Sequence, residues 1–434
     1  MTAVVSGDRP AVSGDRPAVN GDAAGTVDTD AYARATMLIA SAAVVLIGSD
    51  LRVAYGTTAA LAVAVLLFPL WLPVLREHAF ATLITGLAAL SAVAGLILSE
   101  LSSVDHAISA TQRVQAIGLL GSGIATFGLI LWARSVMPLP RIAILYGAGA
   151  LANAVAHGEL DWTYNLAVPT TFVVLGILER RRAGVVPAVA VLTLGVVGIA
   201  QEARGYFGVC VLAAVLTLWQ LRPQRRDVRM QDRARWFPFA LVVGLGFAAY
   251  LLVGPLATGG VPGDADQRRS AARIEASGSS IAGGRPEWAA TRELVSLSPR
   301  GFGVGVVPNW ADRIAGETGL ASIDVDAGGY ADDYMFGSTF ELHSVTADLW
   351  ARFGWVGVAV AAAIVLALMR SMGVLLGARQ APTFLIFACV LALLYVLFGP
   401  MYDNWLDICA VLGMALVPAG AAVSHRGAGA PAAA

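Results

Sequence analysis

The stretch ELHSVTADLWARFGWVGVAVAAAIVLALM, residues 341–369, passes from a polar segment straight into one that suits the interior of a lipid bilayer. One residue of the polar part, His343, lies about ten residues ahead of the apolar run. A helix needs roughly 20 mostly apolar residues to cross a bilayer. The stretch therefore predicts a membrane helix with a histidine held at the membrane surface just before it.

The composition of the whole chain agrees with this prediction. Of the 434 residues, 57% are hydrophobic and only 14% are charged, and the mean hydropathy is +0.70. These values lie far from those of soluble domains and predict an all-α, polytopic membrane protein. The net charge of −1 argues against a nucleic-acid partner, because phosphate contacts require a large basic surplus.

Twelve segments are apolar enough to be predicted as membrane-spanning helices, with the residues between spans nine and ten, 258–352, forming one large loop. Spans one to nine fall within 34–257 and the last three within 353–422. The predicted spans are 35–49, 54–75, 79–99, 114–133, 142–157, 164–178, 183–200, 205–221, 237–257, 353–370, 381–398 and 404–422.

Two polar tails flank the spans. Residues 1–33 contain a tandem repeat, SGDRPAV at 6–12 and 13–19, and bury too little apolar surface to order themselves. Membrane proteins keep arginine in their cytoplasmic loops, and LRPQRRDVRMQDRARW at 221–236 is the most arginine-rich loop. With this loop in the cytoplasm, both termini, including the tail 423–434, are cytoplasmic and the large loop is extracytoplasmic.

The large loop is predicted to contain helices. GRPEWAATRELVSLSP has Pro286 at a first helical position and Pro299 as a stop, and GFGVG at 301–305 is expected to form a tight, exposed turn. Ser338 and Glu341 fit a capping box. That pattern predicts a helix that starts at residue 339, continues into span ten and carries His343 in its second turn.

Three motifs resemble the O-antigen ligase and polymerase family of bacterial membrane proteins. HSVTADLWARFGWVG is similar to the family's histidine-containing motif at the end of its large loop: His343, Gly354 and Gly357 match, whereas Ser344, Ala347 and Arg352 replace an asparagine, a leucine and a glutamate. The other two motifs are GRPEWAATRELVSLSPRGFGVG at 284–305 and ARGYFGVCVLAAV at 203–215.

The resemblance implies a C-type glycosyltransferase fold and an inverting transfer that needs no metal or other cofactor. The donor would be a polyprenyl-diphosphate-linked saccharide at the outer face of the bacterial cytoplasmic membrane. The acceptor would be a hydroxyl of a glycan, a lipid or a protein. Ligase and polymerase differ only in this acceptor, and the sequence leaves both open.

Individual residues suit this chemistry. A histidine with a pKa near 6.5 is suited to take the proton of the acceptor hydroxyl, so His343 is the candidate base. Arginine binds phosphate oxygens through a bidentate fork, so Arg204 and Arg285 are candidates for binding the diphosphate. In the last outer loop, acceptor-sugar contacts are expected from Tyr402, Asp403 and Asn404.

Plainer interpretations and one rival function stay open at this point. His343 can anchor a helix at the membrane interface, Arg204 can extend to lipid headgroups, and Arg285 can be a solvated loop residue. Asp105 and His106 can form a metal or sugar site, although ordinary interfacial polarity is favoured. The rival function is a transporter or a flippase for a lipid-linked sugar; no intramembrane acidic pair that would indicate proton coupling is expected.

Overall fold

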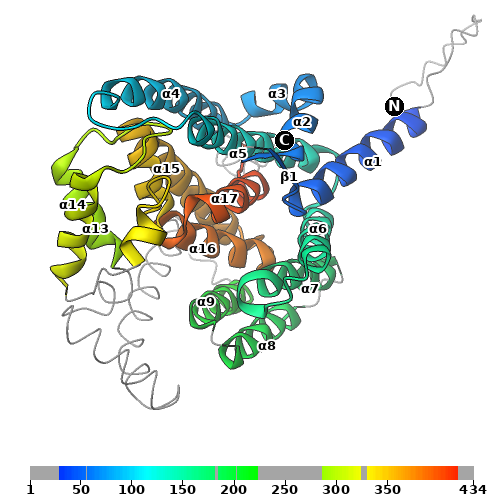
Figure 1. Ribbon diagram of the computed structural model, residues 1–434. Helices are drawn as coiled ribbons and strands as arrows, with labels where there is room; N and C mark the ends of the chain where they lie inside the picture. The colour runs from blue at the N-terminus through cyan, green and yellow to red at the C-terminus, as the bar shows by residue number, and fades with distance from the viewer. Residues whose placement is uncertain are drawn as a thin grey trace, which may run out of the picture.

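The computed structural model describes residues 29–54, 56–180, 184–201, 203–222, 286–323 and 330–418. This part of the chain is helical apart from one short antiparallel ribbon (Figure 1). The elements are α1 (Thr29–Gly48), β1 (Arg52–Ala54), β2 (Thr57–Thr58), α2 (Ala59–Leu66), α3 (Phe68–Arg76), α4 (Ala79–Ser102), α5 (Ala110–Val136), α6 (Leu139–His157), the π-helix η1 (Trp162–Leu166), α7 (Ala167–Arg180), α8 (Val186–Ala200), α9 (Arg204–Gln220), α13 (Glu287–Leu297), α14 (Trp310–Ala321), the π-helix η4 (Tyr330–Met335), α15 (Val345–Gly377), α16 (Thr383–Phe398) and α17 (Met401–Ala415).

Within the described residues, five helices are long and apolar enough to cross a membrane: α1, α4, α5, α6 and α15. The bent pair α2–α3 makes a sixth if it counts as one span, and α8, α9 and α16 are shorter apolar helices. The helical membrane class is therefore confirmed. The predicted count of twelve stays a prediction, since span 237–257 and the tail 423–434 lie outside the described residues.

One predicted boundary near the N-terminus was wrong. Residues 29–33, assigned to the disordered tail, belong to α1. Residues 54–75, predicted as one span, contain the two helices α2 and α3, which meet at a bend of 82°. Pro69 lies in the first turn of α3, where its ring is compatible with a helix start but not with continuation of α2. The Trp71 indole fixes the bend by donating to the Ala64 carbonyl at 2.7 Å.

The centre of the molecule consists of α5, α15, α16 and α17, which pack together with α4 on one side (Figure 1). Glycines permit close approach: a Cβ on Gly413 of α17 would lie 2.8 Å from the Ile130 side chain of α5, and one on Gly123 would lie 2.0 Å from the Trp405 indole. Without a hydrophobic driving force inside lipid, such close van der Waals packing is what holds membrane helices together.

The described parts of the segment predicted to be the large loop form a second, smaller core. Helices α13 and α14 pack against each other, and Phe302, Phe336 and Phe340 are buried between them and the start of α15. Phe302 and Phe340 stack with ring centroids 4.2 Å apart. The helix predicted between Pro286 and Pro299 is confirmed as α13.

The segment GFGVG, 301–305, was predicted to be exposed, and this prediction was wrong. All five residues are buried between α4 and α15, where the Val304 N–H donates to Gly95 O at 3.1 Å and Phe302 N–H to Ala351 O at 2.9 Å. Gly301, Gly303 and Gly305 have positive φ, and a Cβ on Gly303 would lie 2.2 Å from Ser99 N. Glycine is needed here because backbone passes directly over backbone.

Candidate functional site

The candidate site is organised around the start of α15. This helix starts later in the chain than the sequence predicted. Helix α15 begins at Val345, and the Ser344 hydroxyl caps it by accepting the Ala347 N–H at 3.3 Å. His343 precedes the cap with φ +50°, a left-handed conformation that non-glycine residues rarely adopt. The predicted helix start at residue 339 was therefore wrong, and His343 lies on a bent segment outside the helix.

The carboxylate of Asp348 explains this start. It is 2% exposed, and its two oxygens accept the main-chain N–H of Leu342 at 2.7 Å and that of Met401 at 2.9 Å. The first bond folds the segment before α15 back over its first turn, and the second attaches the start of α17. Helix α15 is interrupted at Gly354, whose φ is +64°, so the helix predicted to continue into span ten is kinked there.

A polar cavity of about 200 Å³ opens beside this segment. Its walls come from distant parts of the chain: α5, the buried glycine segment, the residues before α15, α15 itself and α17. Most of the lining side chains are uncharged hydrogen-bonding groups, and two are charged. The lining residues are Gln112, Gln115, Ala116, Gly305, Ser338, Thr339, Glu341, Arg352 and Tyr402.

Arg352 is the buried cation of this cavity, with 7% of its surface exposed. Its Nη2 donates to the Phe340 carbonyl at 3.2 Å, Nη1 lies 4.0 Å from the Met401 sulfur, and Nε has no hydrogen-bond partner within the described residues. Asp348, four residues earlier on α15, forms no salt bridge with Arg352 in the part of the chain that the structure describes. Most donors of this guanidinium therefore remain available.

Glu341 is the acidic group of the cavity. Burial raises the pKa of this carboxyl above its ordinary value, although the positive charge of Arg352 acts in the opposite direction. The sequence assigned Glu341 to a helix cap, so its chemical setting was missed. The Ser338 hydroxyl of the predicted cap instead accepts a hydrogen bond from Gln112 at 3.1 Å.

His343 stands next to the cavity and is not part of its lining. Its ring stacks on Tyr334 at a centroid distance of 4.4 Å and an interplanar angle of 21°. Its Nδ1 lies 3.2 Å from the Glu341 carbonyl, which can only accept, so a neutral ring carries its proton on Nδ1. The lone pair of Nε2 is then free to accept a proton.

The two arginines predicted to bind a diphosphate are not brought into this site by the described residues. Arg285 lies outside them. Arg204 is the first residue of α9, and its side chain also lies outside the described part of the structure. Their roles stay predictions. The arginine that the structure does place in a polar cavity is Arg352, which the sequence comparison had marked as a departure from the family motif.

The three neighbours predicted to contact an acceptor have different positions. Tyr402 lines the cavity, and Arg52 covers the face of its ring at 4.0 Å while donating to its carbonyl at 3.2 Å. Asp403 is exposed. Asn404 is buried, and its amide donates to the Pro400 carbonyl at 2.9 Å, in the first turn of α17. Only Tyr402 of these three therefore contributes to the cavity wall.

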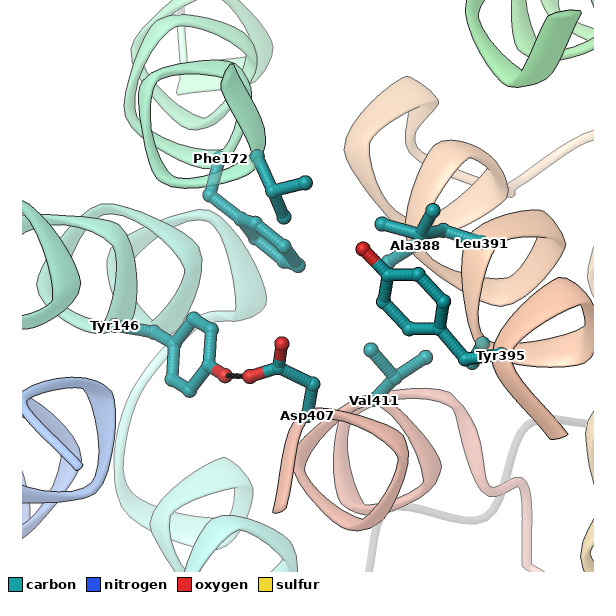
Figure 2. Close-up of a pocket in the computed structure, with 9 residues that line it drawn as sticks. Tyr146, Phe172, Ala388, Leu391, Tyr395, Asp407 and Val411 are labelled. Atoms are coloured by element: carbon teal, nitrogen blue, oxygen red, sulfur yellow. Dashed lines mark hydrogen bonds between the residues drawn. The ribbon is translucent and has the colours of Figure 1, made fainter. Parts of the chain in front are cut away.

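A second polar group, which sequence reasoning missed, lies inside the bundle. Asp407 of α17 accepts a hydrogen bond from the Tyr146 hydroxyl of α6, and Tyr395 of α16 faces the same small, otherwise apolar pocket (Figure 2). Carboxylates within membrane helices are rare and frequently functional. The signal in the sequence was the aspartate four residues after Asp403, within a predicted span.

Asp105 and His106 are the two polar residues named above that precede α5, and His106 contacts Asp312 of α14. Its Nε2 lies 2.9 Å from a carboxylate oxygen of Asp312, which is 1% exposed, and 3.1 Å from the Asn309 amide. This contact attaches α14 to the membrane helices. Within the described residues, no group of three or more metal-ligating side chains includes it.

The fold and these contacts define a helical membrane protein with a polar cavity where the glycine segment 301–305 and residues 338–341 meet α5, α15 and α17. Comparison with known proteins adds no identity: the chain matches no protein-family model, and neither the curated proteins nor the solved structures give a similar protein.

Proposed function

We propose that this protein is a membrane glycosyltransferase of the O-antigen ligase or polymerase type. It transfers or polymerises a glycan from a polyprenyl-diphosphate-linked donor onto an acceptor hydroxyl at the outer face of a bacterial cytoplasmic membrane. Both termini are then cytoplasmic, and the large loop with His343 is outside.

The observation that carries the proposal is the position of His343. Its imidazole is held by Tyr334 on one face and by the Glu341 carbonyl at Nδ1, beside a cavity lined with amides and hydroxyls. Such groups are the donors and acceptors that sugar hydroxyls require. A proton acceptor next to a polar cavity, at the end of a membrane helix, suits the reaction of a lipid-linked sugar with a hydroxyl.

The reaction forms a glycosidic bond, breaks the bond between the sugar and the diphosphate, and transfers one proton. The acceptor oxygen attacks the anomeric carbon of the donor sugar, the bond to the diphosphate breaks, and the hydroxyl proton passes to Nε2 of His343. Polyprenyl diphosphate leaves with the electron pair of the broken bond. Fixed cations stabilise the charge that develops on it, and Arg204 and Arg285 stay the proposed residues for this role.

The test is transfer in proteoliposomes, with lipid-linked saccharides extracted from a strain that lacks the gene. His343→Ala should lower the release of polyprenyl diphosphate by about 100-fold or more, the usual contribution of a general base. The matched control is His157→Ala, since His157 is an exposed histidine at the end of α6. Undiminished transfer by His343→Ala would refute the proposal.

Excess chelator tests the proposed independence from metal. Transfer should be unchanged, and activity that is lost with chelator and restored by Mg²⁺ or Mn²⁺ would contradict this part of the proposal.

The rival function, a transporter or flippase for a lipid-linked sugar, is favoured by the intramembrane pair of Asp407 and Tyr146. Proton-coupled carriers use carboxylates in such positions. The same proteoliposomes separate the two functions. Translocation of the labelled donor that persists in His343→Ala but is lost in Asp407→Asn would identify a carrier. Glycan transfer that is lost in His343→Ala but persists in Asp407→Asn would identify the enzyme.

A further inference from the structure

We infer, on the basis of the proposed function, that the cavity at Arg352 binds one sugar ring of the acceptor and that Arg352 selects a ring bearing a carboxylate, as in a uronic acid. Arg352 was not among the residues predicted to bind substrate. The inference concerns the acceptor, whereas the phosphate-bearing donor is assigned to other residues.

The size and lining of the cavity fit a single ring. A water molecule needs about 10–15 Å³ of such space, so a volume of about 200 Å³ accommodates on the order of a dozen non-hydrogen atoms, about as many as one pyranose contains. The amides of Gln112 and Gln115 and the hydroxyls of Ser338 and Thr339 line it. Each can donate and accept, as a ring with several hydroxyls requires.

The charges of the cavity define which ring fits best. Arg352 is buried without a salt bridge to Glu341, although both line the same space within the described residues. A buried cation without a contacting anion is costly, and its unused donors suit the two oxygens of a carboxylate. Glu341 would accept hydrogen bonds from ring hydroxyls at another point of the lining.

The same charges disfavour a diphosphate in this cavity. A diphosphate carries at least two negative charges, whereas one guanidinium and one carboxyl give the lining no surplus of positive charge. Burial raises the pKa of Glu341, yet even a neutral carboxyl leaves one cation for two or more anionic charges. A singly charged carboxylate therefore matches Arg352 better than the leaving group does.

Binding to the full-length protein in nanodiscs tests the inference without requiring transfer. Ligand-observed NMR would compare methyl glucuronide with methyl glucuronamide, methyl glucoside and inorganic pyrophosphate. Glucuronide should bind roughly tenfold tighter than its two neutral counterparts, because only it offers a charged, bidentate partner. Equal affinities for the three sugars, or tighter binding of pyrophosphate than of glucuronide, would overturn the inference.

Variants locate the site. Arg352→Gln should abolish the preference for glucuronide, and Gln115→Leu should weaken all three sugars alike while retaining the preference. Because Arg352→Gln removes a buried bond to Phe340, the comparison of glucuronide with glucuronamide on the unaltered protein stands as the test if this variant fails to fold.

Glucuronide binding without any transfer by the wild type would refute the proposed function alone. Transfer that depends on His343 without a glucuronide preference would refute this inference alone.

Discussion

The ring of Tyr334 lies flat against the ring of His343, with centroids 4.4 Å apart. The two residues come from different elements, since Tyr334 belongs to η4 and His343 to the bent segment before α15. The stacking fixes the plane of the imidazole, while the Glu341 carbonyl fixes its rotation through Nδ1. Together these contacts orient the candidate base without burying it.

Removing the stacked ring should therefore impair transfer. Aromatic pairs contribute about 0.5–1.5 kcal/mol beyond burial, so Tyr334→Ala should slow transfer roughly 2- to 10-fold in the proteoliposome assay. Tyr334→Phe keeps the ring and should retain nearly full activity. Equal rates for the Ala variant and the wild type would show that the orientation of His343 does not depend on this contact.

Loss of the carboxylate at Asp348 should destabilise the protein. An asparagine amide can accept only one of the two main-chain N–H bonds from Leu342 and Met401, and an unsatisfied buried N–H costs about 1–3 kcal/mol. Thermal unfolding of Asp348→Asn in detergent should show a clearly lower midpoint. Asp403→Asn, on an exposed carboxylate of α17, is the control and should unfold like the wild type.

The buried glycine segment gives a second stability test. Gly303→Ala places a Cβ 2.2 Å from Ser99 N at a φ of +111°, so the loop must separate from α4 and little folded protein should be recovered. Gly86→Ala on α4 meets nothing within 4 Å and should be neutral or stabilising by about 0.5–1 kcal/mol. Normal yield and melting of the Gly303 variant would contradict the buried arrangement of residues 301–305.

The raised pKa of Glu341 predicts a pH dependence of stability. The folded protein binds this proton more tightly than the unfolded chain does, so the stabilisation is fully present below the unfolded carboxyl pKa and is lost as the pH rises through the folded value. Glu341→Gln stays neutral throughout. Its melting temperature relative to wild type should therefore rise as the pH increases above about 4, and a constant or falling difference would contradict the burial of this carboxyl.

The hydrogen bond from Tyr146 to Asp407 can be tested with a matched pair of variants. Tyr146→Phe deprives the carboxyl of its bond and should lower stability by about 1–3 kcal/mol. Tyr395→Phe removes a hydroxyl from the same pocket that makes no hydrogen bond within the described residues, so it should have little effect. Similar melting temperatures for the two variants would show that the Tyr146 bond contributes little.

The sequence by itself determined the class of fold and several of its elements. A run of apolar residues is a local property, and the need to bond every main-chain group inside lipid turns such a run into a helix. Helices α4, α5, α6 and α15 were predictable for this reason, and Pro286 and Pro299 marked α13 equally locally. For the site, the neighbourhood of His343 and the participation of Tyr402 were indicated by the sequence.

Tertiary contacts decided the rest. The hydrogen bonds from the Leu342 and Met401 N–H groups to Asp348 place the start of α15 after His343. Helices α4 and α15 bury the glycine segment 301–305, which the sequence predicted to be exposed. Gln112 meets Ser338 and Arg352 in one cavity although 226 positions separate Gln112 from Ser338 in the chain. No periodicity in sequence encodes such contacts, because they depend on which helix faces pack together, and that choice is made by the shape and hydrogen bonding of the folded chain as a whole.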